Sequence, residues 1–415
     1  MQPYMAWATK RSRVHSQTSP PQGFPVLPAS PAREISLLLA PRVTSRTRDA
    51  AWHRKWHSGQ MEKAIGRRAE LARERGRARG EVVRAAPVQE EVNGSNALDL
   101  EAEGRLKVFS GRAHAELTAE IANYLGVHVG SCSIKEFADG ELNVRIDESV
   151  RGCDVFLVQP TADPNENLIE LCLMVDACKR ASARSITAVM PYFGYGRADR
   201  KVSGRESIAA KLVANMITRA GVDRVLALDL HSGQLEGYFD IPLDKIYSSG
   251  ELVRHLHSQI PPEEVVVVSP DVGGVARARA FAKQLADDVP LAIVDKRRGT
   301  PSRAEVTNLI GEVEGKCAVL VDDIVDTAET LTSAAEVLKQ HNASAIYACA
   351  THAVFSESAP QRLANSEFRE VIVTNSIVVP PERMFPQLTI LHVGSLLGAA
   401  IMRMYESESL SSFRT

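Results

Sequence analysis

Residues 318–330 read AVLVDDIVDTAET, an apolar run that ends in two adjacent carboxylates, Asp322 and Asp323. A short continuous apolar run is typical of a buried parallel strand, and open α/β sheets bind ligands beyond the carboxyl ends of such strands. A helical apolar period follows in residues 331–340, so the turn between them presents free N–H groups and the positive end of a helix dipole. Because acids suit sugar hydroxyls and N–H groups suit phosphate, the stretch predicts a site for a phosphorylated pentose. The alternative is a surface turn capped by Asp and Thr, which a lone acidic turn would favour.

The whole chain has room for two domain cores and a tail, with 415 residues and 44% hydrophobic residues. A net charge of -2 argues against general nucleic-acid binding, and no apolar run approaches the length of a membrane span. Six cysteines show no CxxC spacing and lie in or beside apolar runs, which favours buried thiols in a reducing compartment.

The N-terminal part differs in composition from the rest. Residues 1–60 contain nine Lys and Arg against only Glu34 and Asp49, amid Ser, Thr, Pro and Ala, as organelle transit peptides do. An Arg-rich stretch at 61–84 predicts a solvated helix, and polar residues 89–104 predict a linker. We expect residues 1–104 to be an extension that directs import into a plastid or mitochondrion, with plastid slightly favoured. A start at Met61 would give a cytoplasmic form.

From Arg105 onward, apolar strand-like runs alternate with helical periods, which is the pattern of βαβ units and parallel sheets. The runs lie at 154–159, 185–190, 224–228, 265–269, 291–294, 318–321, 345–350 and 371–374. Several end in an acid or hydroxyl, which suggests two related halves. We predict an α/β fold of two tandem domains, each a mainly parallel sheet flanked by helices, at 105–249 and 250–403, followed by a tail at 404–415 that packs back.

Four further stretches carry chemistry that a polyphosphate would need. Residues 191–201 combine aromatic and cationic side chains in a glycine-containing loop, which suits a base and phosphates or is a plain surface loop. His231 and Asp271 each follow a strand, and together they suggest a Mg²⁺ ion bridging phosphates, although a lone His is more often structural. Three consecutive cations at 296–298 predict a loop that closes over polyphosphate; a solvated loop is the alternative.

Seven short stretches occur in the order found in ribose-phosphate pyrophosphokinases, and the chain resembles that family from about Leu106 to Phe413. They are residues 109–111 (FSG), 137–141 (FADGE), 194–201 (GYGRADRK), 229–234 (DLHSGQ), 269–274 (SPDVGG), 295–298 (DKRR) and 321–330 (VDDIVDTAET).

The resemblance implies two type I phosphoribosyltransferase-like domains and a ribose-phosphate diphosphokinase. Such an enzyme transfers the β,γ-pyrophosphoryl group of Mg-ATP to the 1-hydroxyl of ribose 5-phosphate, giving phosphoribosyl pyrophosphate and AMP for nucleotide, histidine and tryptophan biosynthesis. It also implies a homo-oligomer, from dimer to hexamer, with inorganic phosphate as an activator.

By the same resemblance, each motif receives a role. The catalytic pair is Lys296 and Arg298, and the Mg²⁺ ligands are His231 and Asp271. ATP-binding residues are Phe137, Asp139, Gly140, Glu141, Arg197 and Ala198. Ribose 5-phosphate residues are Asp322, Asp326, Thr327, Ala328, Glu329 and Thr330. A second, regulatory anion site comprises Ser149, Arg151, Ser182 and Arg205.

This chain departs from the family pattern at three places. Ala198 stands where Gln is usual, Glu329 stands where the phosphate loop commonly has Gly, and residues 356–358 read SES where SGP is frequent. We expect the Glu329 side chain to turn outward and to weaken ribose 5-phosphate binding without abolishing activity. Two alternatives stay open: a phosphoribosyltransferase, which would not need the 295–298 loop, and a non-catalytic synthetase-associated regulatory subunit, in which Glu329 has disabled the site.

Overall fold

A computed structural model describes residues 104–297 and 306–413, which all belong to one compact unit, 89–415. The predicted extension up to residue 103 and the predicted catalytic residue Arg298 lie outside the described residues.

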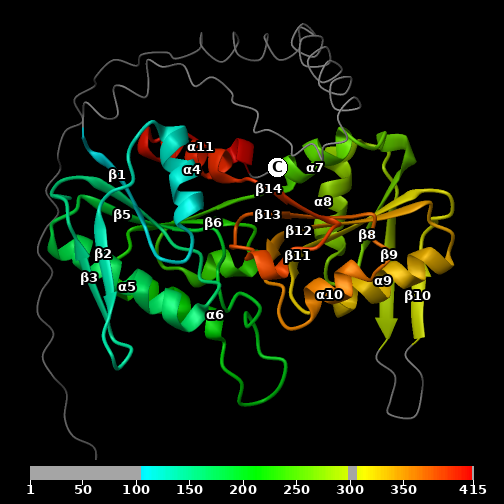
Figure 1. The fold of residues 1–415 in the computed structure, drawn as a ribbon, viewed down its shortest axis with the longest axis horizontal. Helices are drawn as coiled ribbons and strands as arrows, with labels where there is room; N and C mark the ends of the chain where they lie inside the picture. Colours follow the sequence, from blue (N-terminus) through cyan, green and yellow to red (C-terminus); the bar gives the residue numbers. More distant parts are fainter. Residues whose placement is uncertain (1–103, 298–305, 414–415) are drawn as a thin grey trace, which may run out of the picture. The chain divides into compact units, whose positions relative to one another are not determined.

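The first half of the described chain forms a five-stranded sheet in which every neighbouring pair is parallel (Figure 1). Its strands lie in the order β1-β4-β5-β6-β7. Their bounds are β1 (Leu106–Ser110), β4 (Asp154–Val158), β5 (Ser185–Met190), β6 (Arg224–Leu228) and β7 (Leu243–Ile246).

Helices cover both faces of this sheet, because side chains alternate along each strand. Val155 and Leu157 of β4 join the core beneath α5 (Pro164–Arg180) and α6 (Ala209–Ala220), whereas Phe156 and Val158 join the core beneath α4 (Ala115–Leu125). An antiparallel hairpin, β2 (Cys132–Glu136) with β3 (Leu142–Ile146), stands beside α5 as a separate arm.

The second half forms a seven-stranded sheet, which is parallel except for its edge strand β10. The strand order is β10-β9-β8-β11-β12-β13-β14. The bounds are β8 (Val265–Ser269), β9 (Leu291–Arg297), β10 (Val306–Ile310), β11 (Cys317–Val325), β12 (Ala345–Ala353), β13 (Glu370–Thr374) and β14 (Leu388–Leu391).

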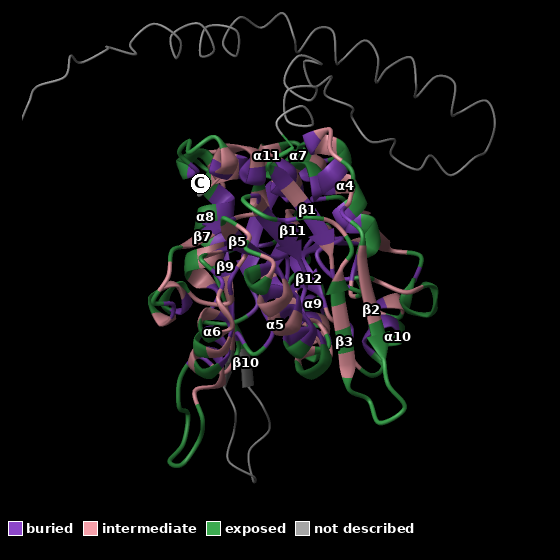
Figure 2. Cartoon of the chain, turned by 90° about the vertical axis from the view of Figure 1, so that its left-hand side faces the viewer, coloured by how far each residue is buried: buried purple, intermediate pink, exposed green. Residues whose placement is uncertain are grey.

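This sheet is also covered on both faces. Helices α7 (Ser249–His257) and α8 (Val275–Leu285) share one core with it, and α9 (Glu329–Gln340) and α10 (Ala359–Ala364) share the other. Strands buried on both sides read as continuous apolar runs, and β8, with the sequence VVVVS, is buried throughout. Figure 2 shows the resulting buried layer between half-exposed helices. Short 3₁₀ helices lie at Gly233–Tyr238, Pro262–Glu264, Pro381–Arg383 and Ser411–Phe413.

The last helix, α11 (Gly394–Tyr405), follows the second sheet in sequence but packs against α4 of the first half. Glycines make this close contact possible: a Cβ at Gly394 would lie 2.3 Å from Glu120 Cβ, and one at Gly398 would lie 2.6 Å from Tyr124 Cδ1. In the tail, the carbonyl of Phe413 accepts a hydrogen bond from Tyr247 N–H (3.1 Å).

The predicted fold class is confirmed, and all eight predicted strands are present. The exact domain boundaries stay a prediction. Across the described residues, no helix combines the length and the apolar character that a membrane span requires.

Candidate active site

The paired acids lie in a part of β11 that extends beyond one of its neighbours. Pairing with β8 ends at Leu320, whereas pairing with β12 continues through Asp322 to Val325. The sequence suggested that Asp322 and Asp323 follow the strand. They lie inside it, because β12 still supplies a backbone partner on one side. The open side of this extension faces the loop and first turn of α8.

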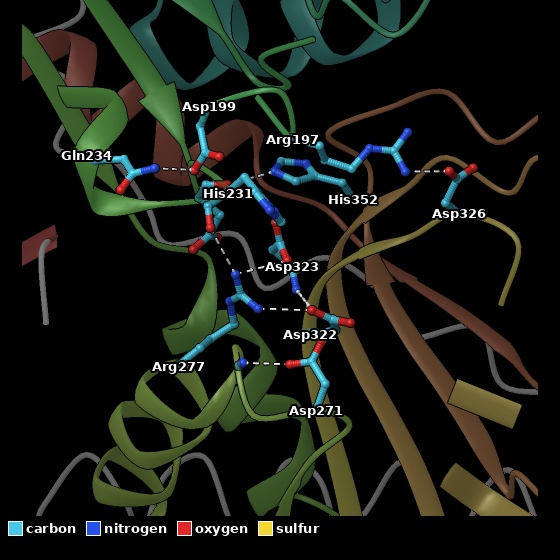
Figure 3. A network of polar contacts seen from close by, with 12 residues as sticks. Arg197, Asp199, His231, Gln234, Asp271, Arg277, Asp322, Asp323, Asp326 and His352 are labelled. Atoms are coloured by element: carbon cyan, nitrogen blue, oxygen red, sulfur yellow. Dashed lines mark hydrogen bonds and ion pairs between the residues drawn. The ribbon is translucent and has the colours of Figure 1, made fainter. Parts of the chain in front are cut away.

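Arg277, near the start of α8, binds both carboxylates (Figure 3). Its Nη1 lies 2.9 Å from Asp322 Oδ1, and its Nη2 lies 2.9 Å from Asp323 Oδ1. The sequence interpretation missed this residue. A signal existed, since a cation in the first turn of a helix opposes the helix dipole and needs a local anion.

His231 completes the network from the other half of the chain. Its Nδ1 lies 2.8 Å from Asp323 Oδ2, and this hydrogen bond raises the pKa of His231. Burial and the charge of Asp323 raise the pKa of Asp322 to about 7. Although burial opposes it, the hydrogen bond with His231 and the charge of Arg277 lower the pKa of Asp323. The two neighbouring acids therefore differ: Asp323 is the stronger acid of the pair and Asp322 the weaker.

Of the predicted Mg²⁺ ligands, Asp271 offers the oxygen donor that this ion prefers, and His231 offers a ring nitrogen. Asp271 Oδ1 accepts from Gly274 N–H (2.8 Å), which leaves Oδ2 for a metal, and His231 keeps Nε2. Within residues 104–297 and 306–413, no three His, Cys, Asp or Glu side chains gather as a metal cluster. Mg²⁺ needs no such cluster, because it retains waters and is held by one or two protein groups plus phosphate oxygens.

The predicted phosphate loop, residues 326–330, turns directly into α9. Ala328 has a positive φ of 63°, and its carbonyl accepts the helical hydrogen bond from Thr332 N–H (3.0 Å). In the described part of the chain, no acceptor is recorded for the N–H groups of residues 327–330. These groups are available for an anion at the N-terminal end of a helix dipole.

Glu329 has the outward orientation that we expected. Its side chain is 65% exposed, and its Oε1 lies 3.3 Å from Nη2 of Arg362 on α10. Arg362 Nη1 also donates to the carbonyl of Thr327, within the phosphate loop. Glu357, in the third departure from the family pattern, has a φ of 53°, a conformation that glycine adopts without strain.

Arg197, a predicted ATP residue of the first half, forms an ion pair with Asp326 of the phosphate loop. The two atoms, Nη1 and Oδ2, lie 2.5 Å apart. Nearby, Asp199 accepts a hydrogen bond from Gln234 Nε2 (2.7 Å), and Ala198 N–H donates to Tyr195 O (2.9 Å). The predicted nucleotide loop and the predicted pentose loop are therefore in contact.

A cluster of hydrogen-bonded polar side chains, centred on Asp229, links the two sheets behind the site. Asp229 Oδ2 accepts from Ser248 Oγ (2.7 Å) and Thr351 Oγ1 (2.9 Å), and His352 Nε2 lies 3.1 Å from Asp229 O. The ring of His352 also meets Tyr192 edge-on at 5.0 Å. Because Asp229 lies two residues before His231, this group helps to fix the position of the imidazole.

Other predicted residues lie apart from this network. Phe137, Asp139, Gly140 and Glu141 form the exposed turn of the β2–β3 arm, where Phe137 is 55% exposed. In the predicted second anion site, Gly152 N–H donates to Ser182 O (2.9 Å), which places the loop of Ser149 and Arg151 beside Ser182. No contact between these residues and exposed Arg205 is recorded in the described part of the chain. The backbone of Lys296 pairs with Thr307 across β9 and β10.

Two mainly parallel sheets, with paired acids and a phosphate loop at strand ends, define a phosphoribosyltransferase-type α/β protein. Residues 106–221 match the family described as the N-terminal domain of ribose phosphate pyrophosphokinase, and residues 297–414 match the phosphoribosyl synthetase-associated domain. The chain belongs to the ribose-phosphate pyrophosphokinase family.

Similar proteins support this assignment along nearly the whole described region. The ribose-phosphate pyrophosphokinase of Gloeobacter violaceus is 60% identical over 309 residues, which are 74% of this chain and 92% of that protein. The chloroplastic ribose-phosphate pyrophosphokinase 2 of Arabidopsis thaliana is 62% identical over 310 residues, covering 74% and 77%. A crystal structure of phosphoribosylpyrophosphate synthetase from Mycobacterium smegmatis has a TM-score of 0.69 at 42% identity, covering 73% of this chain and 99% of that one.

Proposed function

We propose that this chain is a ribose-phosphate diphosphokinase, which converts ATP and ribose 5-phosphate into phosphoribosyl pyrophosphate and AMP. The observation that carries the proposal is the contact between two loops: Arg197 of the nucleotide loop pairs with Asp326 of the phosphate loop. ATP bound on the nucleotide loop and ribose 5-phosphate bound on the phosphate loop would therefore lie next to each other. A regulatory subunit is less favoured, because the sequence retains Lys296, Arg298, His231 and Asp271.

The pentose would bind at the end of β11. Asp322 would accept hydrogen bonds from ribose hydroxyls, and the N–H groups of residues 327–330 would hold the 5-phosphate. The β2–β3 arm, with Phe137 at its turn, and the loop of Arg197 and Ala198 would hold ATP. These roles place the 1-hydroxyl and the polyphosphate between the two halves of the chain.

In the reaction, the 1-hydroxyl oxygen of the ribose forms a bond to the β-phosphorus of ATP. The bond between that phosphorus and the oxygen that bridges it to the α-phosphorus breaks. AMP leaves with the bridging oxygen, and the hydroxyl proton is released. Lys296 and Arg298 would stabilise the charge that develops on the transferred group. His231 and Asp271 would hold Mg²⁺, which neutralises phosphate charge when bound.

The test uses the full chain with ATP labelled in the β-phosphate, ribose 5-phosphate and MgCl₂. We expect label in phosphoribosyl pyrophosphate and release of unlabelled AMP. The variant Lys296→Ala should lower turnover by orders of magnitude and change ATP binding much less, because the cation acts mainly on the transition state. Phosphoribosyl pyrophosphate without label, or a fully active Lys296→Ala variant, would contradict the proposed chemistry.

We further propose that the active unit is at least a dimer, with a hexamer expected. The arm that carries Phe137 makes no recorded contact with Arg197 in the described part of the chain, which supports a role for the arm in the nucleotide site of a neighbouring subunit. Inorganic phosphate would act as an activator at the second anion site. Light scattering of the active protein tests the assembly, and an active monomer would rule it out.

A plastid location is supported by relatives from Arabidopsis thaliana and Oryza sativa whose names include the word chloroplastic. Fusing residues 1–104 to a fluorescent protein tests this location, with a mitochondrial or diffuse cytosolic signal as the contrary result.

A further inference from the structure

The phosphate loop carries a negative side chain where an anion is expected to bind. Glu329 is the first residue of α9, so its carboxylate starts within one residue of the N–H groups that would hold a phosphate. A helix N-terminus attracts acidic side chains as well as phosphate, and two like charges at this end would repel each other. Something must therefore keep the Glu329 carboxylate out of the loop.

Arg362 contacts both the Glu329 carboxylate and the backbone of the phosphate loop. Its Nη2 lies 3.3 Å from Glu329 Oε1, and its Nη1 donates to the carbonyl of Thr327. The side chain is half-buried, at 32% exposure. Its helix is anchored, because the next residue, Leu363, is fully buried in the core and Arg362 N–H donates to Ser358 O (2.9 Å).

Other acids near Arg362 do not replace Glu329 as its partner. Glu336 and Glu367 line the same surface groove between α9 and α10, with a volume of about 400 Å³. Glu367 pairs with Lys339 at 3.5 Å. Among the ion pairs recorded in the described part of the chain, Arg362 has Glu329 as its acidic partner.

The bond to Thr327 acts on the loop directly. The chain has no cis peptide bond in its described part, and in a trans peptide the C=O and the following N–H point in opposite directions. When Arg362 holds the Thr327 carbonyl, it turns the N–H of Ala328 to the opposite side, away from the guanidinium. One guanidinium thus withdraws a competing carboxylate and orients a phosphate-binding N–H.

We propose that Arg362 is a positioning residue for ribose 5-phosphate, which makes the phosphate loop usable despite Glu329; this rests on the proposed function. The role needs two donors in a fixed fork, so Lys cannot fully replace Arg. It acts on binding of the phosphorylated pentose and leaves ATP binding and the chemical step largely untouched.

A double-mutant cycle tests the role, with wild type, Arg362→Gln, Glu329→Gln and the double variant. Glu329→Gln removes the charge and keeps the shape. We expect Arg362→Gln to raise the Michaelis constant for ribose 5-phosphate about five-fold or more, the size typical of one exposed ion pair plus a lost hydrogen bond. The constant for ATP and kcat should change less than about two-fold, and in the Glu329→Gln background the effect of Arg362→Gln should shrink to the part due to Thr327.

Lys339→Gln is the matched control, because it breaks the exposed pair with Glu367 at the far end of α9 and should change neither constant. Arg362→Lys should fall between wild type and Arg362→Gln. If Arg362→Gln raises the Michaelis constant for ribose 5-phosphate equally in the wild-type and Glu329→Gln backgrounds, the link to Glu329 is overturned. If Arg362→Gln changes this constant in neither background, the positioning role of Arg362 is overturned.

Calorimetric titration with ribose 5-phosphate separates this inference from the proposed function. If the wild-type protein binds ribose 5-phosphate but does not turn it over, the diphosphokinase proposal fails. The effect of Arg362 can then still be measured, as the change in the dissociation constant for ribose 5-phosphate across the double-mutant cycle. If wild type binds no ribose 5-phosphate, the positioning role fails as well. Thermal unfolding of each variant identifies any that fail to fold, and Arg362→Lys then takes the place of Arg362→Gln in the cycle.

Discussion

Arg277 neutralises two neighbouring carboxylates, and its loss should therefore leave charge without a partner inside the site. We expect Arg277→Met, which keeps the length and apolar stem of the side chain, to lower the free energy of unfolding by about 2–3 kcal/mol. The value lies below that for a fully buried pair because Arg277 is 30% exposed. Urea unfolding measures the change, and binding of ribose 5-phosphate should weaken with it.

The control for this variant is Arg279→Met, on the same helix. Arg279 is exposed and belongs to no ion pair recorded in the described part of the chain, so its replacement should change stability by less than about 0.5 kcal/mol. Equal losses from the two variants would mean that the acids are not held by Arg277.

Single residues also show how far the sequence could be interpreted. The acids at 322 and 323 were predictable, since their types and their place after an apolar run carry the signal. Their unequal pKa values were not, because these depend on Arg277 and His231, which lie 45 and 92 positions earlier in the chain. The ion pair between Glu329 and Arg362 was hidden for the same reason, although the outward direction of Glu329 was predicted from the length of its side chain.

At the scale of elements, the contact between α4 and α11 depends on small residues. Gly394→Ala should lower the free energy of unfolding by about 1–3 kcal/mol, because the new Cβ would meet Glu120 Cβ at 2.3 Å, a position with no rotational freedom to move away. The gain in helix propensity is small at the first residue of a helix. Differential scanning calorimetry measures the change.

Gly250→Ala provides the comparison, since Gly250 also lies in the first turn of a helix and a Cβ there would meet nothing within 4 Å. This variant should be neutral or slightly stabilising. A Gly394→Ala protein as stable as Gly250→Ala would show that α4 and α11 can separate at little cost.

Central strands were easier to predict than edge strands. β8 and residues 318–321 of β11 are buried on both faces and read as apolar runs, whereas β7 and β14 are short edge strands of four residues with only partly buried side chains in two or more positions, and were missed. The strand β10 was missed as well, although it pairs with β9. An edge strand has one neighbour, so its composition is less constrained and its sequence signal is weaker.

At the scale of the whole molecule, the return of α11 to the first half could not be inferred from a repeat of βαβ units. A helical period in residues 394–405 would not identify the partner of the helix's apolar face, which is α4, near the start of the described chain. A polar link accompanies this contact: His392 Nδ1 lies 2.6 Å from Glu120 Oε1, and Asn375 Nδ2 donates to the same carboxylate at 3.0 Å.

This link predicts a stability difference that depends on pH. The hydrogen bond with Glu120 raises the pKa of His392, with a further contribution from Glu116. Although burial opposes it, His392 and Asn375 lower the pKa of Glu120, and His114 acts in the same direction. The histidine stabilises the fold fully below its unfolded pKa of about 6.5 and less as the pH rises through its folded value; the glutamate does so above about 4.5. Together they act most strongly between about pH 4.5 and 6.5.

His392→Gln should therefore be less stable than wild type at pH 5.5, by roughly 0.5 kcal/mol, and the gap should close by pH 8.5. The value is small because the His392 side chain is 69% exposed and water screens the pair. Urea unfolding at both pH values measures the gap, with His257→Gln as the control, because His257 is exposed at the end of α7 and has no ion pair recorded in the described part of the chain. A gap that is equal at both pH values would show that His392 acts by packing and not by charge, and a gap that widens toward pH 8.5 would contradict the assigned direction of the pKa shift.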